Sequence, residues 1–357
     1  MKRNTIMKYR LLGKSGLRVS EVSLGTMTFG DEWGWGSPKA EAQKVYETYR
    51  EAGGNFIDTA NFYTNGTSET FLGEFMQGHR ESVVLATKYS HAAPGNDPNA
   101  AGNHRKSMMH AVEVSLKRLQ TDYIDLYWVH IWDGITPVEE VMRGLDDLVR
   151  QGKVLYVGIS DAPAWWVAQA NTLAELRGWT QFIGLQLEYS LIERTVEREL
   201  IPMAKALNLG VLAFSPLAGG FLTGKYHGEG KPDGGRMTNE GLKAFFPGEQ
   251  HAADHLGRGI SRRTDWSQHG ASCTRLVAPS NAASNSDHWS AEGISTPGQS
   301  RQFGSGTLRR TIEIPRWRKP NRTRIPAEYL RQRNGSWSQV WWHVGSLAAL
   351  NAAVQAE

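Results

Sequence analysis

The stretch NFIDTANFYTNGTSE, residues 55–69, holds an apolar run that ends in the carboxylate of Asp58, followed by Tyr63 and a polar, glycine-containing turn. A buried strand does not need an acid at its end, because burying a charge without a partner is costly. Parallel strands that lead into loops, in contrast, bring their last residues to one rim, where a site can be built. The stretch therefore predicts a strand over 55–60 whose end contributes to a functional site.

Further apolar runs alternate downstream with segments of helical period, which indicates βα units and a parallel sheet. One such helix, EAQKVYETYREAG (41–53), is expected to place Val45, Tyr49 and Ala52 on one face and to end at Gly53 and Gly54. Upstream, YRLLGKSGLRVSEVSLG (9–25) predicts a two-stranded hairpin around Gly13 to Gly16, followed by a strand-like run. The predicted strands after 55–60 are SVVLATK (82–88), YIDLYWVH (123–130), VLYVGIS (154–160), FIGLQLEY (182–189) and GVLAFSP (210–216).

Six βα units with short connections favour a closed (β/α)8 TIM barrel, with an open doubly wound sheet as the alternative. The residues at the strand ends favour the barrel over the open sheet, because each strand carries a polar group to the same rim. A G-x-G-x-x-G motif is absent from the sequence, so a Rossmann domain is not supported. The polar strand-end residues are Asp58, Lys88, His130, Ser160, Gln186 and Ser215.

Taken singly, four of the candidate residues have ordinary structural explanations. Asp58 can cap a helix, Tyr63 can be an amphipathic loop residue, and His130 can be a satisfied core imidazole. Lys88 is harder to explain in this way, because a lysine that ends an apolar strand must reach water or a carboxylate.

Taken together, the same four residues predict proton transfer to an alkoxide. A tyrosine is a poor acid at neutral pH unless a cation stabilises its phenolate and lowers its pKa, and Lys88 is expected to supply that cation to Tyr63. Asp58 would pair with Lys88, and His130 would hydrogen-bond the substrate carbonyl. Because side chains cannot deliver a hydride, this chemistry implies a nicotinamide cofactor.

Seven ordered motifs over about 220 residues resemble the aldo-keto reductases, and in particular the branch of potassium-channel β subunits and bacterial aldo/keto reductases. The resemblance implies a (β/α)8 barrel, NADP(H) as cofactor and a catalytic tetrad at Asp58, Tyr63, Lys88 and His130. The motifs are LGTMTFG (24–30), FIDTANFYTNGTSE (56–69), VVLATK (83–88), SLKRLQTDYIDLYWVH (115–130), GKVLYVGIS (152–160), LQLEYSLIER (185–194) and LAFSPLAGGFLTGKY (212–226).

The same resemblance implies a set of cofactor-binding residues along the barrel rim. Two positions depart from the common family pattern: Asp161 follows Ser160 where asparagine is usual, and Phe214 replaces a tyrosine. The implied contacts are Gly25, Thr26 and Met27 near the nicotinamide, Ser160 and Gln186 at its amide, Phe214 on its ring, and Ser215, Leu217, Gly219 and Lys225 toward the pyrophosphate.

The composition of the chain changes near Pro247. Residues 1–247 contain 26 Lys and Arg against 28 Asp and Glu, whereas residues 248–357 contain 14 basic residues against 8 acidic ones. We therefore expect an incomplete reductase barrel over 1–247, with the last two βα units lost, and a non-family, poorly ordered tail over 248–357. The basic segment RWRKPNRTR (316–324) is then an accident of composition, and no nucleic-acid partner is expected.

One hypothesis for this change is a shifted reading frame. Permitted codons for Thr264 to Ala278, read after skipping one base, encode LIGRSMAQAALAWLL, and those for Ser286 to Glu292 encode PIIGAR, which resemble the missing family segments. That reading also restores an arginine suited to a 2′-phosphate, which favours NADP(H) over NAD(H).

Three interpretations of function follow from the sequence. The first is an NADPH-dependent reductase of small aldehydes or ketones, the second a cofactor-binding regulatory subunit without turnover, and the third an inactive frameshift product. Trp33, Trp35 and Trp132 are candidates for an apolar substrate pocket. The single cysteine, Cys273, and the absence of a long apolar run predict a cytoplasmic protein without a membrane or metal partner. Substrate identity and oligomeric state stay open.

Overall fold

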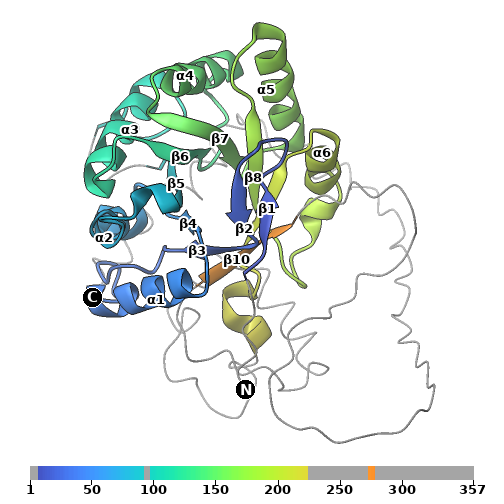
Figure 1. The fold of residues 1–357 in the computed structure, drawn as a ribbon. Helices are drawn as coiled ribbons and strands as arrows, with labels where there is room; N and C mark the ends of the chain where they lie inside the picture. The colour runs from blue at the N-terminus through green and yellow to red at the C-terminus, as the bar shows by residue number, and fades with distance from the viewer. Residues whose placement is uncertain (1–6, 92–96, 224–271, 278–357) are drawn as a thin grey trace, which may run out of the picture. The chain divides into compact units, whose positions relative to one another are not determined.

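The computed structural model describes residues 7–91, 97–223 and 272–277, and these form a barrel of strands surrounded by helices (Figure 1). Seven parallel strands run in chain order around the barrel, and an antiparallel eighth strand closes it. The barrel strands are β3 (Val22–Gly25), β4 (Phe56–Asp58), β5 (Val84–Tyr89), β6 (Ile124–Val129), β7 (Val154–Ser160), β8 (Phe182–Glu188), β9 (Gly210–Phe214) and β10 (Ser272–Val277).

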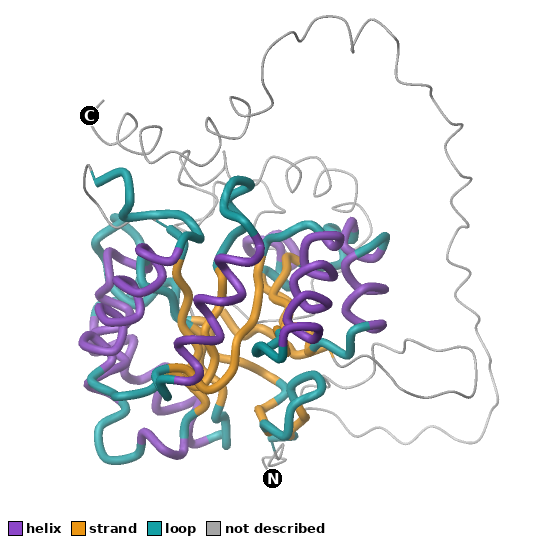
Figure 2. Tube along the Cα trace, turned by 90° about the horizontal axis from the view of Figure 1, so that it is seen from above, coloured by secondary structure: helices purple, strands orange, loops and turns teal. Residues whose placement is uncertain are grey.

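Helices cover the outside of the barrel, and the view in Figure 2 shows them beside the strands. Their ends follow local sequence signals: α4 and α5 begin directly after Pro137 and Pro163, and α5 ends at Gly178, whose φ is +64°. The α-helices are α1 (Lys39–Glu51), α2 (Thr67–Phe75), α3 (Arg105–Leu119), α4 (Val138–Arg150), α5 (Ala164–Arg177) and α6 (Leu200–Ala206), and the 3₁₀ turns are η1 (Tyr63–Gly66), η2 (Arg80–Ser82), η3 (Thr195–Glu197) and η4 (Ala218–Thr223).

An N-terminal hairpin, β1 (Tyr9–Leu11) and β2 (Arg18–Ser20), confirms the predicted antiparallel pair. Its turn lies against the first residues of β8 and β9: a Cβ on Gly13, whose φ is +57°, would be 2.3 Å from the carbonyl oxygen of Ile183. Glycine is needed here both for the left-handed backbone and for the close approach. The hairpin thus covers the N-terminal end of the barrel and leaves the opposite end for a site.

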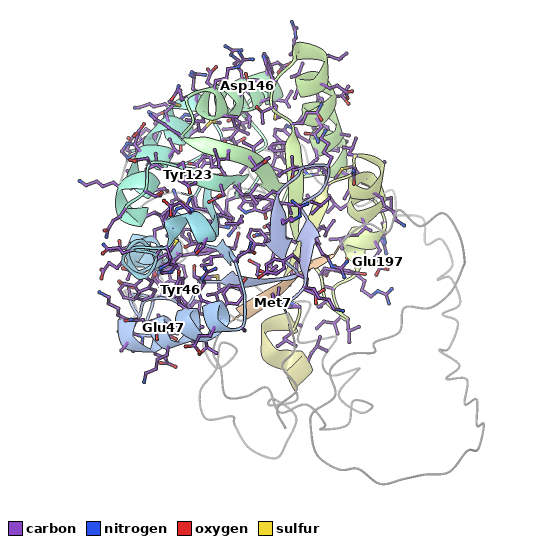
Figure 3. All side chains as sticks on the ribbon, viewed as in Figure 1. Met7, Tyr46, Glu47, Tyr123, Asp146 and Glu197 are labelled. Carbon is purple, nitrogen blue, oxygen red and sulfur yellow. The ribbon has the colours of Figure 1, made fainter. Side chains whose placement is uncertain are left out.

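Apolar side chains fill the barrel interior and the layer between strands and helices. Figure 3 draws the described side chains on the ribbon. Trp128 is fully buried in the interior, and its ring occupies the space where Cβ atoms of Gly158 and Gly184 would otherwise lie. Burying side chains of this size contributes roughly 1.5–3 kcal/mol each, so the interior cluster is a main source of stability.

The structure confirms the barrel and corrects its strand count. The six predicted strands are β4 to β9, and the strand-like run after the hairpin is the seventh parallel strand, β3, which pairs with β4. The expected loss of the last two units concerns the part of the chain after residue 223, of which the structure describes only 272–277, and it stays a prediction. The segment after residue 247 was expected to supply no strand with a following helix. It does supply the strand β10, which pairs antiparallel with β3 and β9, while the residues after β10 lie outside the described part.

Two further expectations concern the buried face of α1 and the tail after residue 247. On α1 the fully buried residues are Ala42, Tyr46 and Tyr49, so only Tyr49 of the predicted face is buried to this degree. The predicted face was shifted because Val45 is only partly covered at the edge of that core cluster. The rest of the predicted poorly ordered tail, 248–271 and 278–357, lies outside the described residues.

Candidate active site

A buried lysine lies at the centre of the candidate site. Lys88, on β5, is fully buried, and its ammonium group donates to Asp58 Oδ2 at 2.5 Å, to the carbonyl oxygen of Thr59 at 2.8 Å and to the Tyr63 hydroxyl at 3.2 Å. A lysine ammonium has three hydrogens, and each finds an acceptor here. The strand-end lysine therefore meets the carboxylate and the phenol that the sequence predicted for it.

Asp58 is itself held from a second side. Its other oxygen, Oδ1, accepts a hydrogen bond from Gln186 Nε2 at 3.0 Å, which ties the end of β4 to β8 across the barrel mouth. Thr26 supports the same strand end, because its backbone N–H and its hydroxyl both donate to the Asp58 carbonyl oxygen, at 3.0 and 3.1 Å. The carboxylate thus occupies one fixed position beside Lys88.

The electrostatics of Lys88 and Tyr63 follow from this packing. Burial alone would lower the pKa of Lys88, but the neighbouring Asp58 and Tyr63 raise it, and the net shift is upward. Burial also raises the pKa of the Tyr63 phenol, and this effect exceeds the opposing effect of Lys88. Lys88 therefore acts on the Tyr63 pKa in the predicted direction, but the expected net lowering was wrong for the protein alone, because burial outweighs the lysine charge and Asp58 opposes it further.

His130 follows β6 and completes the group. Its ring lies edge-on to the Tyr63 ring, with centroids 5.8 Å apart, and its Nδ1 is buried without a hydrogen-bond partner among the described residues. Burial, together with His91 and Lys88, holds the pKa of His130 well below its usual value. His130 is therefore a neutral imidazole at physiological pH, able to donate through one nitrogen only.

Next to this group, aromatic rings line the rim of the barrel. The Phe62 ring contacts those of Trp33 and His91, with centroid distances of 5.5 and 4.6 Å, and Trp33 contacts Trp35. Two of the three predicted pocket tryptophans thus lie beside the site. The third, Trp132, packs instead against Trp165 at 5.8 Å.

A cavity of about 190 Å³ lies at the ends of β7 and β8 and is lined by Asp161, Gln186 and Glu188. Ser160 and Gln186 are register partners on these strands. Asp161 is an exposed residue in the wall of this cavity, and desolvation by the protein around its carboxyl group, together with the Glu188 charge, raises its pKa to about 7. Its φ of +42° is rare for a residue other than glycine and is typical of functional loops.

The segment after β9 turns through several left-handed residues. Ser215, Ala218, Gly219 and Gly220 have φ values of 50°, 49°, 60° and 100°. Small residues in such a turn let an anion approach the backbone closely. Phe214 ends β9, and Leu217 is exposed, whereas Lys225 lies outside the described residues.

Sequence reasoning missed one residue that supports the loop carrying Tyr63. Arg118, at the end of α3, donates to the Asn61 carbonyl oxygen at 2.7 Å and pairs with the fully buried Glu69. Its local signal was present, since a basic residue in the last turn of a helix is common, but that signal indicates only helix stabilisation. His91 was missed as well, and no local pattern pointed to it.

Comparison with known proteins is consistent with this geometry. The model of the aldo/keto reductase family matches residues 21–268. The chain belongs to the aldo/keto reductase family. Its relatives include a norsolorinic acid reductase of Aspergillus flavus, 44% identical over 230 residues, which are 60% of this chain and 59% of that protein.

Two further relatives carry related names. An aryl-alcohol dehydrogenase [NADP(+)] of Phanerodontia chrysosporium is 44% identical over 219 residues, 57% of each chain. An aldo-keto reductase of Emericella nidulans is 38% identical over 259 residues, 69% of this chain and 64% of that protein. The chain thus spans less than two thirds of the length of these relatives. Within the described residues, no helix is long and apolar enough to cross a membrane.

Proposed function

We propose that this protein is an NADP(H)-dependent oxidoreductase that reduces aromatic aldehydes or ketones to alcohols. The observation that carries the proposal is the fully buried Lys88, which bonds both Asp58 and the Tyr63 hydroxyl. The names of its relatives support the cofactor and an aryl substrate. The rings of Trp33 and Phe62 beside the site offer flat apolar faces that suit an aromatic substrate.

The residues at the barrel mouth fit a dinucleotide. Gln186 uses its N–H to bond Asp58, and among the described residues its amide oxygen accepts no hydrogen bond, so that oxygen is available to a carboxamide. Ser160 lies beside it in register, and the left-handed turn over 215–220 suits a pyrophosphate. When bound, the cofactor supplies the hydride.

The side chains of this protein then handle the proton. Tyr63 is protonated at neutral pH, and burial raises its pKa further, so it keeps its hydroxyl proton until the carbonyl oxygen becomes an alkoxide basic enough to take it. Lys88 stabilises the phenolate that remains, since its own pKa is raised and it stays charged. His130 donates to the same oxygen and orients the carbonyl group.

The function is tested by measuring NADPH binding through tryptophan fluorescence and NADPH oxidation with benzaldehyde. Tyr63→Phe should reduce turnover about 10²–10⁴-fold, the usual contribution of a general acid, while leaving NADPH binding nearly unchanged. Binding of NADPH without turnover of any aromatic aldehyde would favour a regulatory subunit of the channel β-subunit type. Absence of binding would overturn the proposal.

For residues 248–357 we keep the shifted reading frame as a proposal. It is supported by the change in composition after Pro247, although the family match extends to residue 268. Removing one base after the Pro247 codon tests it: binding of NADPH that appears only in the corrected chain would support the shift and an inactive product. Equal binding by both chains would refute it.

A further inference from the structure

His91 and His130 form a pair of imidazole rings at the edge of the site. Their centroids are 4.4 Å apart with the rings at 89°, and Phe62 contacts His91 at 4.6 Å and His130 at 5.7 Å. Both residues are partly buried, and the edge-on contact means that the His91 ring covers part of the His130 ring. A histidine in this position controls what can reach the His130 ring.

The backbone that places His91 is unusual. Ser90, directly before it, has a φ of +108°, which a residue other than glycine rarely adopts. The strained residue is fixed by its own hydroxyl, which accepts from Asn103 Nδ2 at 2.9 Å and from the His130 backbone N–H at 3.2 Å. Strain that is held in place by several bonds persists where function requires the geometry.

The unpartnered nitrogen of His130 decides which tautomer is favoured. Among the described residues nothing bonds Nδ1, which is buried. A buried N–H without an acceptor is rarer in proteins than a buried acceptor without a donor. The proton of the neutral ring therefore belongs on Nε2, where it can be donated to a substrate oxygen.

Protonation of the pair is opposed from several sides. The positive charge of Lys88, on β5, disfavours the imidazolium form of both rings. His91 also disfavours protonation of His130. The Tyr63 ring, on η1, contacts His130. Burial, and then Lys88, lowers the pKa of His91 to about 4. A cationic His130 would carry a second N–H at the buried Nδ1, and the ring would be drawn away from the substrate toward water.

We propose that His91 is a positioning residue, whose ring shields His130 from solvent and holds it as the neutral Nε2–H tautomer, with that N–H directed at the carbonyl oxygen beside Tyr63. The part of this statement that concerns substrate rests on the proposed function. The part that concerns the tautomer of His130 does not, and it can be measured in the protein without cofactor.

The first experiment is ¹⁵N NMR of the histidine side chains of the full chain between pH 5 and 8. In wild type and His91→Phe, His130 should stay neutral with the proton on Nε2 throughout. In His91→Ala, water reaches the ring, so His130 should titrate near the usual histidine pKa of about 6.5 and exchange between tautomers. His91→Ser also leaves the His130 ring uncovered and should release the tautomer too, which provides a second variant if the alanine substitution impairs folding.

The second experiment is the pH profile of benzaldehyde reduction. His91→Ala should lose about tenfold in kcat, with little change in KM, and gain a fall in rate below pH 7, whereas His91→Phe should keep the wild-type profile. His79→Ala is the matched control, because His79 bonds Tyr46 and lies in another part of the fold. It should alter neither the His130 spectrum nor the profile.

The outcomes separate the two proposals. If His130 keeps one neutral tautomer in both His91→Ala and His91→Ser, or if His91→Phe behaves like His91→Ala, the positioning role is overturned. If the His130 spectra change as expected but the wild-type chain reduces no aromatic aldehyde, the proposed function fails and the positioning role stands.

Discussion

Replacing Lys88 with methionine should destabilise the protein strongly, because it leaves a carboxylate in the barrel without its cation. The Lys88 side chain is 0% exposed and that of Asp58 is 10% exposed, so water cannot replace the lost ammonium group. Without Lys88, the Asp58 carboxylate keeps, among the described residues, only the hydrogen bond from Gln186. The substitution is therefore a test of how much the central contact of the site contributes to stability.

The magnitude can be worked from the contacts. Removing one partner of a buried ion pair costs about 3–5 kcal/mol, since the remaining charge is left uncompensated. Methionine fills a similar volume and recovers about 1 kcal/mol of apolar burial, so a net loss of about 2–4 kcal/mol is expected. That loss is a large fraction of a typical unfolding free energy of about 5–15 kcal/mol.

The assay is urea unfolding at pH 7, followed by far-UV circular dichroism. Lys39→Met is the matched control, because Lys39 pairs with Glu74 with side chains 47% and 39% exposed, and its loss should change stability by less than about 1 kcal/mol. In the double variant Asp58→Asn with Lys88→Met the stranded charge is gone, and stability should return to within about 2 kcal/mol of wild type.

Two results would refute this reasoning. One is a Lys88→Met variant that loses no more stability than Lys39→Met. The other is a double variant no more stable than Lys88→Met alone, which would mean that the lost hydrogen bonds, and not the isolated carboxylate, set the cost.

Three other perturbations test separate features of the structure. The pKa of Tyr46, marked in Figure 3, is raised to about 12 by burial, so the stability that its phenol contributes is complete below pH 10 and is lost toward pH 12. In urea unfolding, Tyr46→Phe should therefore be about 1 kcal/mol less stable than wild type at pH 7 and more stable than wild type near pH 12. Gly158→Ala should cost about 1–3 kcal/mol in the same assay, because the new Cβ would lie 2.3 Å from the Trp128 ring. Gly16→Ala should be nearly neutral, because nothing lies within 4 Å of its new Cβ. Equal losses of stability in the two variants would contradict the close packing of Trp128 on Gly158. The raised pKa of Asp161 means that the native state retains a proton which the unfolded chain loses near pH 3.8. Wild type should therefore lose stability relative to Asp161→Asn as the pH rises from about 4 to about 7, and no further above that pH. A stability difference that stays constant with pH would show that the carboxyl group is not desolvated.

The sequence predicted the parts of the fold that show a local periodicity of apolar residues or that follow from a general rule of topology. Apolar runs located β4 to β9, and the rule that parallel strands end at one rim brought Asp58, Lys88 and His130 together although they lie far apart in the chain. The strand count failed at β3 because this strand is short and follows directly on the hairpin, so its run was not counted as a separate unit. The antiparallel direction of β10 depends on which edges are free, which no local pattern encodes.

The direction of the Tyr63 pKa could not be predicted from residue types, because two opposing effects have to be weighed. The sequence indicates that a lysine and a tyrosine meet, but not that the phenol is buried or that Asp58 offsets the lysine charge. His91 escaped prediction for a related reason. Its position depends on the strained Ser90 and on a bond from Asn103, which lies 13 residues further along the chain.

The loop that carries Tyr63 shows how far the site depends on such long-range contacts. Thr64 and Asn65 follow the tyrosine in left-handed conformations, with φ of 46° and 57°, each of which costs about 1–2 kcal/mol for a residue other than glycine. The strain is held by the Thr64 hydroxyl, which donates to the Phe29 carbonyl oxygen at 2.6 Å, and by Arg118, which bonds the loop backbone from α3. Because these contacts join α3 and the segment after β3 to the loop, the phenol that we propose as the proton donor is set in place before any substrate arrives. Under the proposed function, positioning the phenol in advance removes an ordering cost from the chemical step, which is why a strained loop can be retained beside the fully buried Lys88.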